Sequence, residues 1–418
     1  MRRVNEYAGS GRLGSGGVVW LARVAGWAGL ATLLVPGSAT GAGVWLRGDL
    51  HMHSTYSDGD SPVADVVQRG EDQGLDFLAL TDHDTSLGGN PAHWTDPDYR
   101  SDTLILLYGI EWTTGKGHAN VWAAQPYDYA PLWEANRAED VDTAIRLAHD
   151  QGAVFSINHP AAYACCPWEY ENTEPADSVE VWNGTYRVPC FNGQATHDFY
   201  DGRLSNGRTP AAVGGSDTHY LSFPQAPFWT IGNPTTWVYA SARTAEAVLD
   251  AIRAGHTSVS YGPTAPRLEL WADGDGDGAT ETMMGDAVPS GRRVDFLVRL
   301  VDPDGSAPAR QARPARTVPR SMLDAMFAGK VSPLDVYRAT AGQREESCRG
   351  HLLVMVRDGR PFHAATLPCG TESYGFHDKP EPGSYYRVEA IGFPDDLNPI
   401  QRPLYGETTA ISSPIYAE

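Results

Sequence analysis

A chain of 418 residues is long enough for two domains, or for one barrel and an appendage. Its formal net charge of −20 argues against non-specific binding to nucleic acid or to an anionic membrane surface. The charge suits a protein that holds divalent cations, although ordinary solubility explains it equally well. We therefore expect a small-molecule substrate, no nucleic-acid partner and an oligomeric state that composition does not predict.

The first 42 residues differ from the rest of the chain. Arginines precede an apolar stretch over residues 18–35, and small residues follow up to Ala42. This order predicts a secretory signal, and hence export to the periplasm or the cell exterior. Arg23 shortens the apolar stretch, so a disordered leader on a cytoplasmic protein is the alternative. After the leader, no stretch approaches the about 20 apolar residues of a membrane span.

The five cysteines are interpreted as structural. Cys348 could pair with Cys369, and Cys190 could pair with Cys165 or Cys166, which leaves one thiol over. Disulfides would agree with export to an oxidising compartment.

From residue 43 to residue 263, apolar strand-like runs alternate with helical segments, which is typical of a parallel α/β fold. The expected strands include residues 44–46, 75–80, 104–107, 153–157, 180–183, 211–213 and 236–239. Helices are expected over residues 61–73, 141–150 and 244–254, with stop signals at Gly74, Gly152 and Gly255. Ser61 should cap the first helix, with Pro62 at its first position.

From residue 264 to residue 418, strand-like runs separated by turn signals predict a small antiparallel β-sandwich. The stretch from Ser306 to Gly342 reads as an insertion or mobile loop with a short helix over 321–327. Asp273, Asp275 and Asp277 match the first half of a calcium-binding loop. The glutamate expected at its twelfth position is absent, so a calcium site and a polar hairpin loop both remain open.

Residues that commonly bind metal ions follow one apolar run after another. His51 and His53 come after the run 44–46, and alternate residues on an extended chain point the same way. Further along stand His83, Glu111, His118, His159, Asp217 and His219. Barrel enzymes build their sites from loops at the carboxyl ends of their strands. The pattern therefore predicts a metal site at one end of a barrel.

The run from His51 to Gly59, HMHSTYSDG, followed by TDHD at residues 81–84, resembles the PHP family, named for polymerases and histidinol phosphatases. The resemblance covers about residues 47–263, and residues 258–263 and 412–416 look more narrowly like a carbaryl-hydrolase-like bacterial branch. It implies a distorted (β/α)7 TIM-like barrel over residues 43–263, ahead of the small β-rich domain. The barrel would hold two or three divalent ions of manganese, iron or zinc.

The resemblance also implies a distribution of the ligands. His51, His53, Glu111 and Asp217 would bind a first ion, and Glu111 would bridge to a second ion held by His118 and His159. Asp58, His83 and His219 would bind a third ion. Since many relatives have histidine where Asp58 stands, this site is harder and favours Mn²⁺ or Fe²⁺ over Zn²⁺.

Adjacent metal ions lower the pKa of a bound water and hold the oxygens of a transferring group. We therefore expect attack by metal-bound hydroxide, with Glu111 as the bridging carboxylate. Asp84 is a candidate general acid, or it orients a ligand imidazole. Asn158 and Asn183 are candidate substrate contacts, and Lys116 and Arg187 are the cationic candidates for a phosphate oxygen.

The leading hypothesis is a metal-dependent phosphoesterase that acts on a small phosphomonoester or diester. Hydrolysis of an ester, amide or carbamate by the same centre is the alternative, with an apolar pocket lined by Trp112, Trp122, Trp168 and Trp182. A non-catalytic, metal-stabilised binding module is a third possibility. The complete ligand set favours an enzyme.

Overall fold

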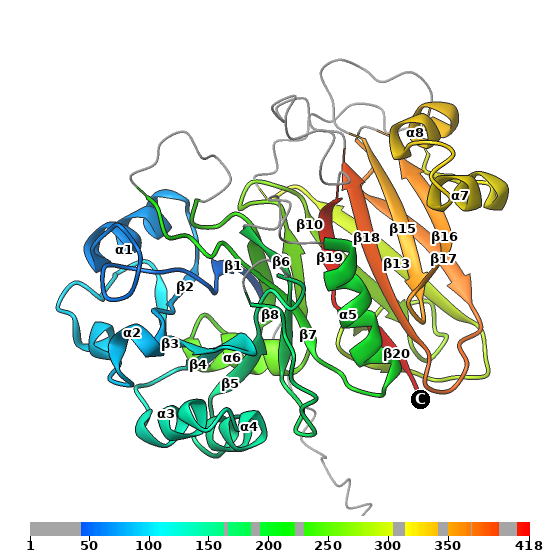
Figure 1. Ribbon diagram of the computed structural model, residues 1–418. Coiled ribbons are helices and arrows are strands. Elements are labelled where there is room, and N and C mark those ends of the chain that lie inside the picture. Colours follow the sequence, from blue (N-terminus) through cyan, green and yellow to red (C-terminus); the bar gives the residue numbers. More distant parts are fainter. Residues whose placement is uncertain are drawn as a thin grey trace, which may run out of the picture. The chain divides into compact units, whose positions relative to one another are not determined.

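The computed structural model describes residues 43–162, 166–184, 193–221, 230–303, 314–341, 350–368, 370–392 and 408–418 (Figure 1). The expected leader over residues 1–42 lies outside these ranges, as do Arg187 and four cysteines, Cys165, Cys190, Cys348 and Cys369. Among the described residues, no helix combines the length and the apolar character needed to cross a membrane.

The first part of the chain forms strands flanked by helices. Its strands are β1 (Val44–Asp49), β2 (Phe77–Leu80), β3 (Ile105–Thr114), β4 (Gly117–Ala123), β5 (Val154–Ile157), β6 (Ser178–Asn183), β7 (Ala211–Gly215), β8 (Thr235–Ala240) and β9 (Thr257–Ser260). Its helices are α1 (Val63–Asp72), α2 (Asp84–Leu87), the 3₁₀ helix η1 (Ala92–Thr95), α3 (Ala130–Arg137), α4 (Val141–Asp150), α5 (Gly193–Ser205) and α6 (Ala245–Arg253).

The strands of this part form a mixed sheet. β1, β2 and β3 are parallel, and so are β5, β6 and β7, but β4 is antiparallel to both β3 and β5. Only Gly115 and Lys116 separate β3 from β4, so no helix can cross over between them. The α/β class is confirmed, whereas the distorted (β/α)7 barrel is not.

β1 and β7 meet at their carboxyl ends, beyond the last residues of the two strands. Met52 and Thr218 form an isolated parallel bridge. The backbone N–H of Asp217 donates to the carbonyl of His51 at 2.8 Å, and that of His53 donates to the carbonyl of Thr218 at 3.0 Å. Within the described ranges no longer ladder joins the two strands. The contacts between the β1 and β7 segments are therefore at the carboxyl ends of these strands, where the predicted ligands also lie.

The helix predictions agree closely with the structure. Residues 141–150 form α4, and its first turn is capped by the Asp140 side chain, which accepts the Thr143 N–H. The helix expected over 244–254 is α6, capped by Thr244. The predicted Ser61 cap of α1 is wrong, because the Ser61 hydroxyl donates to the Asp60 carboxylate at 2.6 Å.

The second part is largely antiparallel, as predicted. Its strands are β10 (Arg267–Asp273), β11 (Thr282–Met283), β12 (Ala287–Val288), β13 (Val294–Val301), β14 (Arg316–Thr317), β15 (His351–Arg357), β16 (Arg360–Leu367), β17 (Ser373–Asp378), β18 (Tyr385–Gly392), β19 (Thr408–Ser412) and β20 (Ile415–Ala417). The sheet β11-β10-β13-β17 shares an apolar core with β15, β16 and β18. Because β19 pairs with β9, one hydrogen-bonded sheet runs from the first part into the second.

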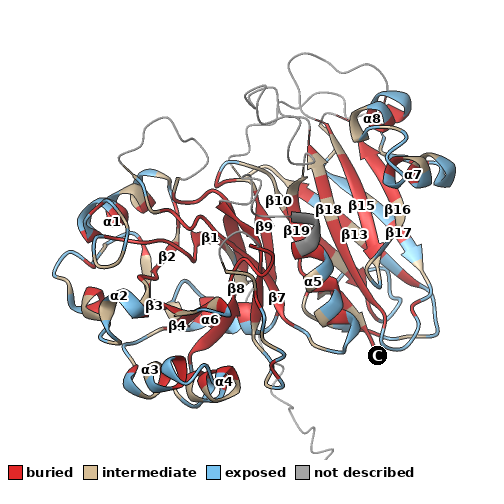
Figure 2. Ribbon diagram, in the orientation of Figure 1, coloured by how far each residue is buried: buried red, intermediate tan, exposed pale blue. Residues whose placement is uncertain are grey.

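Two sequence interpretations of this part can be compared with the structure. The stretch 306–342, interpreted as a loop with one short helix, holds β14 and two helices, α7 (Arg320–Phe327) and α8 (Pro333–Ala341), in its described part. They cover β15 and β16 with buried side chains (Figures 1 and 2). In the acidic loop, Asp273 accepts the backbone N–H groups of Gly276 and Gly278, so its carboxylate already has partners. The calcium site remains a prediction.

A buried charge cluster connects α5 to β18. The guanidinium of Arg387 is 3% exposed and donates to both carboxylate oxygens of Asp201, from Nε at 2.8 Å and from Nη2 at 2.6 Å. It also pairs with Glu389, whose carboxylate lies 3.3 Å from Nδ1 of His197. We call these four residues the Arg387 cluster. Within this cluster, the guanidinium of Arg387 balances the carboxylates of Asp201 and Glu389. The chain therefore supplies both the negative and the positive charges.

Candidate metal centre

The nine residues predicted as metal ligands lie together at the carboxyl-end edge of the sheet. His51 and His53 follow β1, His83 follows β2, His159 follows β5, and Asp217 and His219 follow β7. Glu111 and His118 lie on the β3–β4 hairpin, where His118 is opposite Thr113. Met52, between the two histidines, is buried in an apolar cluster with α1 residues. Strand alternation thus sends His51 and His53 to one side and Met52 to the other.

The carboxylate of Glu111 lies at the middle of the cluster and is 1% exposed. Imidazole nitrogens of five histidines lie within 3.5 Å of its oxygens. They are Nδ1 of His83 at 2.8 Å, Nδ1 of His118 at 3.2 Å, Nε2 of His51 and of His159 at 3.4 Å, and Nε2 of His53 at 3.5 Å. A carboxylate in this place can be shared by neighbouring ions.

The carboxylate of Asp217, which follows β7, lies near two of these histidines, His51 and His53. Its Oδ1 lies 3.4 Å from Nε2 of His51 and 3.2 Å from Nε2 of His53. Its φ of 52° is in the left-handed region, which a residue with a side chain rarely adopts. The turn after β7 thus aims this carboxylate at the histidines despite an unfavourable backbone conformation.

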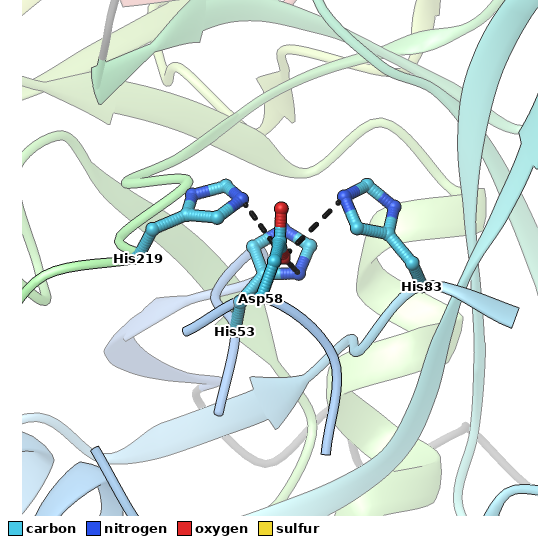
Figure 3. Close-up of side chains that lie close together, drawn as sticks. All are labelled: His53, Asp58, His83 and His219. Carbon is cyan, nitrogen blue, oxygen red and sulfur yellow. Dashed lines mark ion pairs between the residues drawn. The ribbon is translucent and has the colours of Figure 1, made fainter. Parts of the chain in front are cut away.

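The outer rim of the cluster is formed by Asp58, His83 and His219, with His53 beneath them (Figure 3). Oδ1 of Asp58 lies 3.3 Å from Nε2 of His219, 3.7 Å from Nε2 of His83 and 3.8 Å from Nδ1 of His53. The Asp58 side chain is 55% exposed, whereas that of His53 is fully buried. Asp58 is therefore the ligand candidate that is most open to solvent among these four residues.

Burial and mutual attraction move the pKa values of the deep groups in opposite directions. Burial alone would lower the pKa of His51, but the charges of Asp217, Glu111 and Glu180 raise it well above its usual value. Burial alone would raise the pKa of Glu111, but the imidazoles of His83, His51 and His118 hold it well below the usual value. In the same way, the pKa of Asp217 is held well below its usual value by neighbouring histidines. The carboxylates are thus kept ionised.

The histidines nearer the rim differ from one another. Burial lowers the pKa of His53 to about 4, and the neighbouring His219 and His83 add to this effect. The pKa of His219 rises to about 9, because its pairing with Asp58 and the charge of Asp217 outweigh burial. A neutral imidazole is the form that binds a metal ion, so His53 is already in that form.

The arrangement fits divalent ions. Nε2 of His51 and Nε2 of His53 are buried and have no hydrogen-bond partner, although carboxylate oxygens lie only 3.2–3.5 Å away. Buried imidazole nitrogens that converge on carboxylates without hydrogen bonds are typical of ligands around a common ion. Sets whose ligand atoms lie within 4.8 Å of one another include His51, His53 and Asp217; His51, Glu111 and His159; His83, Glu111 and His118; and His53, Asp58, His83 and His219.

Asp84, the candidate general acid, contacts other groups than the ligand imidazoles. Its buried carboxylate accepts from the Tyr129 hydroxyl at 2.6 Å, the Asn136 amide at 2.9 Å and the Thr113 N–H at 3.1 Å. Burial raises its pKa to about 7. The hydroxyl of Thr113, not Asp84, lies 2.7 Å from Nδ1 of His83. Asp84 thus anchors α3 to the end of β3 in the part of the chain described.

The two asparagines that were candidate substrate contacts hold carboxylates of the centre. The Asn158 amide donates to Oε1 of Glu111 at 2.9 Å. The Asn183 amide donates to Oδ2 of Asp217 at 3.2 Å and to Glu180 at 3.0 Å. These bonds direct the carboxylates toward the histidines.

The candidate phosphate-binding cations are not part of the described cluster. The ammonium of Lys116, at the exposed tip of the β3–β4 hairpin, pairs with Glu139 at 2.7 Å. Arg187 lies outside the described residues. A phosphate group would therefore depend on other positive charge within the described centre.

Sequence reasoning missed several residues that touch the ligands, and three of them stand out. Glu180 on β6 contacts His51, Asp49 accepts the backbone N–H groups of His51 and Ser216, and Sγ of Cys166 lies 3.9 Å from Nδ1 of His159. The sequence does contain a signal for Glu180, because this is the one ionisable residue in the strand SVEVWN, all of whose residues are buried. A charge in such a strand indicates a specific partner.

The four tryptophans considered for an apolar pocket are packing residues. Trp112, Trp122, Trp168 and Trp182 are between 0% and 7% exposed and belong to the hydrophobic clusters of the first part. A pocket lined by these side chains would need them to move.

One known family model matches part of the chain. Residues 49–156 match the PHP domain model. The resemblance to this family is thus confirmed for these residues, whereas the carbaryl-hydrolase-like branch is not. No curated protein matches the chain.

Two solved structures show distant similarity. One is a two-domain protein from Bacteroides vulgatus containing a predicted PHP-like metal-dependent phosphoesterase, with 15% identity, coverage of 90% of this chain and 95% of that chain, and a TM-score of 0.42. The other is an amidohydrolase from Chromobacterium violaceum, with 16% identity, coverage of 42% of this chain and 88% of that chain, and a TM-score of 0.28. Similarity at this level does not carry an argument about activity.

Proposed function

We propose that this chain, whose residues 49–156 form a PHP domain, is a metal-dependent hydrolase of small phosphomonoesters or phosphodiesters. Its small-molecule substrate would enter at the rim formed by Asp58, His83 and His219. The proposal concerns the substrate class and leaves the leaving group open.

The observation that carries the proposal is a charge imbalance. Glu111, Glu180 and Asp217 are buried, and among the described residues their ion pairs are with histidines only. Neither an ammonium nor a guanidinium group pairs with them in this part of the chain. Buried carboxylates need cations or hydrogen-bond donors. Divalent ions supply that charge at the point where unpartnered imidazole nitrogens also converge.

The ligands divide into three adjacent positions. His51, His53, Glu111 and Asp217 would hold one ion, Glu111, His118 and His159 a second, and Asp58, His83 and His219 a third. Ions held in this way lower the pKa of water and stabilise the charge of an in-line displacement. Asn158 and Asn183 keep the carboxylates turned toward the ions, and Asp49 fixes the backbone at His51 and Ser216.

Phosphate esters are favoured over carbonyl substrates by two features. Neighbouring ions bind the anionic oxygens of a phosphoryl group directly, which accounts for a centre without described lysine or arginine partners. The tryptophans that would have bound an aryl carbamate are buried in the core.

The test is a comparison of initial rates on protein reconstituted with Mn²⁺. Nitrophenyl phosphate and bis-nitrophenyl phosphate are compared with nitrophenyl acetate and an aryl carbamate. We expect turnover of a phosphorus substrate, and its loss in His53→Ala with an unchanged circular dichroism spectrum. Turnover of carbonyl substrates alone would move the chain to the ester, amide or carbamate hydrolases. Unchanged turnover in His53→Ala would contradict the site.

A further inference from the structure

Glu180 is a buried carboxylate that touches ligands of two neighbouring ion positions. It lies on β6, is 2% exposed and faces the predicted ligands with both oxygens. We propose that Glu180 is a positioning residue that sets the affinity of the first two positions together, by holding His51 and His159. This inference rests on the metal centre of the proposed function but not on its substrate.

The first oxygen of Glu180 determines which nitrogen of His51 is available. Oε1 lies 3.0 Å from Nδ1 of His51, so the ring carries its proton on Nδ1. In the neutral form that binds a metal ion, the other nitrogen, Nε2, then presents its lone pair to the space between Glu111 and Asp217, each 3.4 Å away. A carboxylate bonded to the far nitrogen of a ligand histidine orients the ring and makes it a stronger ligand.

The second oxygen of Glu180 holds a ligand residue by its backbone. Oε2 accepts the N–H of His159 at 2.9 Å. His159 has a φ of 24°, a conformation that residues with side chains rarely adopt, so surrounding contacts must maintain it. This hydrogen bond is one such contact. The Nε2 of His159 reaches Glu111 as a result.

The carboxylate is itself fixed on two sides. The Asn183 amide donates to Oε2 and also reaches Asp217, which links β6 to a third ligand. From β7, Gly215 packs against the Glu180–His51 pair. A Cβ added to Gly215 would lie 2.3 Å from Cβ of His51 and 2.8 Å from Oε1 of Glu180. The backbone of β7 therefore packs closely against this side of the pair and leaves space there for glycine but not for a side chain.

The experiment measures affinity rather than hydrolysis. Mn²⁺ is titrated calorimetrically into chelator-stripped wild type, Glu180→Ala and Glu180→Gln. We expect Glu180→Ala to bind about 10–100-fold more weakly, the usual effect of removing the partner of a ligand. Glu180→Gln should lie between the two, because its single amide oxygen can accept from either His51 or His159. At high Mn²⁺ concentration both variants should recover hydrolysis.

Glu269→Gln is the matched control. Glu269 is equally buried, but it lies on β10 and pairs with Arg267 and Trp271, away from the centre. Its substitution should leave Mn²⁺ affinity unchanged. Equal weakening in Glu180→Gln and Glu269→Gln would reduce the role of Glu180 to general stability and overturn the proposal, as would an unchanged affinity in Glu180→Ala. A wild type that binds Mn²⁺ without hydrolysing any phosphate ester contradicts only the proposed function. A wild type that binds no divalent ion overturns both.

Discussion

The molecule contains two buried clusters of carboxylates that are balanced in different ways. In the Arg387 cluster, a guanidinium with two bonds to Asp201 and a pair with Glu389 supplies the positive charge. In the metal centre, three carboxylates face imidazoles and, within the described residues, no permanently charged cation. The two clusters thus differ in the source of the positive charge that balances their carboxylates. The first cluster has its cation within the chain, whereas the second, on our proposal, takes its cations from solution.

The largest effect on stability is expected at the Arg387 cluster. Arg387→Met would leave the buried Asp201 and the partly buried Glu389 without their cation, which costs about 3–5 kcal/mol of the free energy of unfolding. Urea unfolding in the presence of chelator measures the loss. Adding Asp201→Asn and Glu389→Gln to Arg387→Met should restore much of it. A loss below about 1 kcal/mol would show that this cluster does not need its guanidinium.

In the proposed metal centre, by contrast, the main effect of a substitution should be on the hydrolysis rate. Glu111→Gln removes the carboxylate that we propose is shared by two positions, and we expect the hydrolysis rate to fall at least about 100-fold, or about 2.7 kcal/mol in the barrier. The rate on the best phosphate ester, at saturating Mn²⁺, checks this. Arg387→Met at a temperature where it is folded serves as control and should keep its Mn²⁺ affinity. Similar rates for wild type and Glu111→Gln would remove Glu111 from the reaction.

The effect of chelator on the free energy of unfolding should distinguish the two clusters directly. Ions present at about 100 times their dissociation constant stabilise the folded state by about 2.7 kcal/mol. Chelator should therefore lower the free energy of unfolding of wild type and of Arg387→Met by the same amount, because distant sites act additively. Glu111→Gln should lose much less. If chelator affects all three proteins equally, the ions bind elsewhere.

A smaller effect is expected from pH at the Arg387 cluster. Burial would raise the pKa of Glu389, but His197 and Arg387 hold it well below its ordinary value of 4.5. Glu389 therefore stabilises the folded state above about pH 4.5, and this contribution is lost as the pH falls toward its lower folded pKa. The stability difference between wild type and Glu389→Gln, measured with chelator, should be larger at about pH 6 than at about pH 3. A difference that grows on acidification would contradict the pairing.

The smallest effect is expected at the exposed rim. Asp58 is 55% exposed, and exposed charges interact weakly through water. Asp58→Asn should reduce the number of bound ions by at most one and leave the affinity of the buried positions unchanged. Elemental analysis after dialysis gives the count. Loss of all ions in Asp58→Asn would show that the deep positions depend on the rim.

The sequence predicted the parts of the site that local rules determine. Alternation after an apolar strand places His51 and His53 on one side, and Asp217 follows its strand in the same way. The β3–β4 hairpin was not predicted, because the expectation of a helix after every strand overrode the short Gly115–Lys116–Gly117 turn. The roles of Asn158 and Asn183 depend on which carboxylate each amide meets across the sheet. Such contacts join residues 34 and 47 positions apart, and no local pattern encodes them.

The most direct test of the central claim is the number of divalent ions bound per chain in wild type and in Glu111→Gln. Both proteins are stripped with chelator, reconstituted with Mn²⁺, dialysed and submitted to elemental analysis. Charge balance in the buried centre predicts two or three ions in wild type and at most one in Glu111→Gln. A wild type without ions, or equal occupancy in the two proteins, would contradict it.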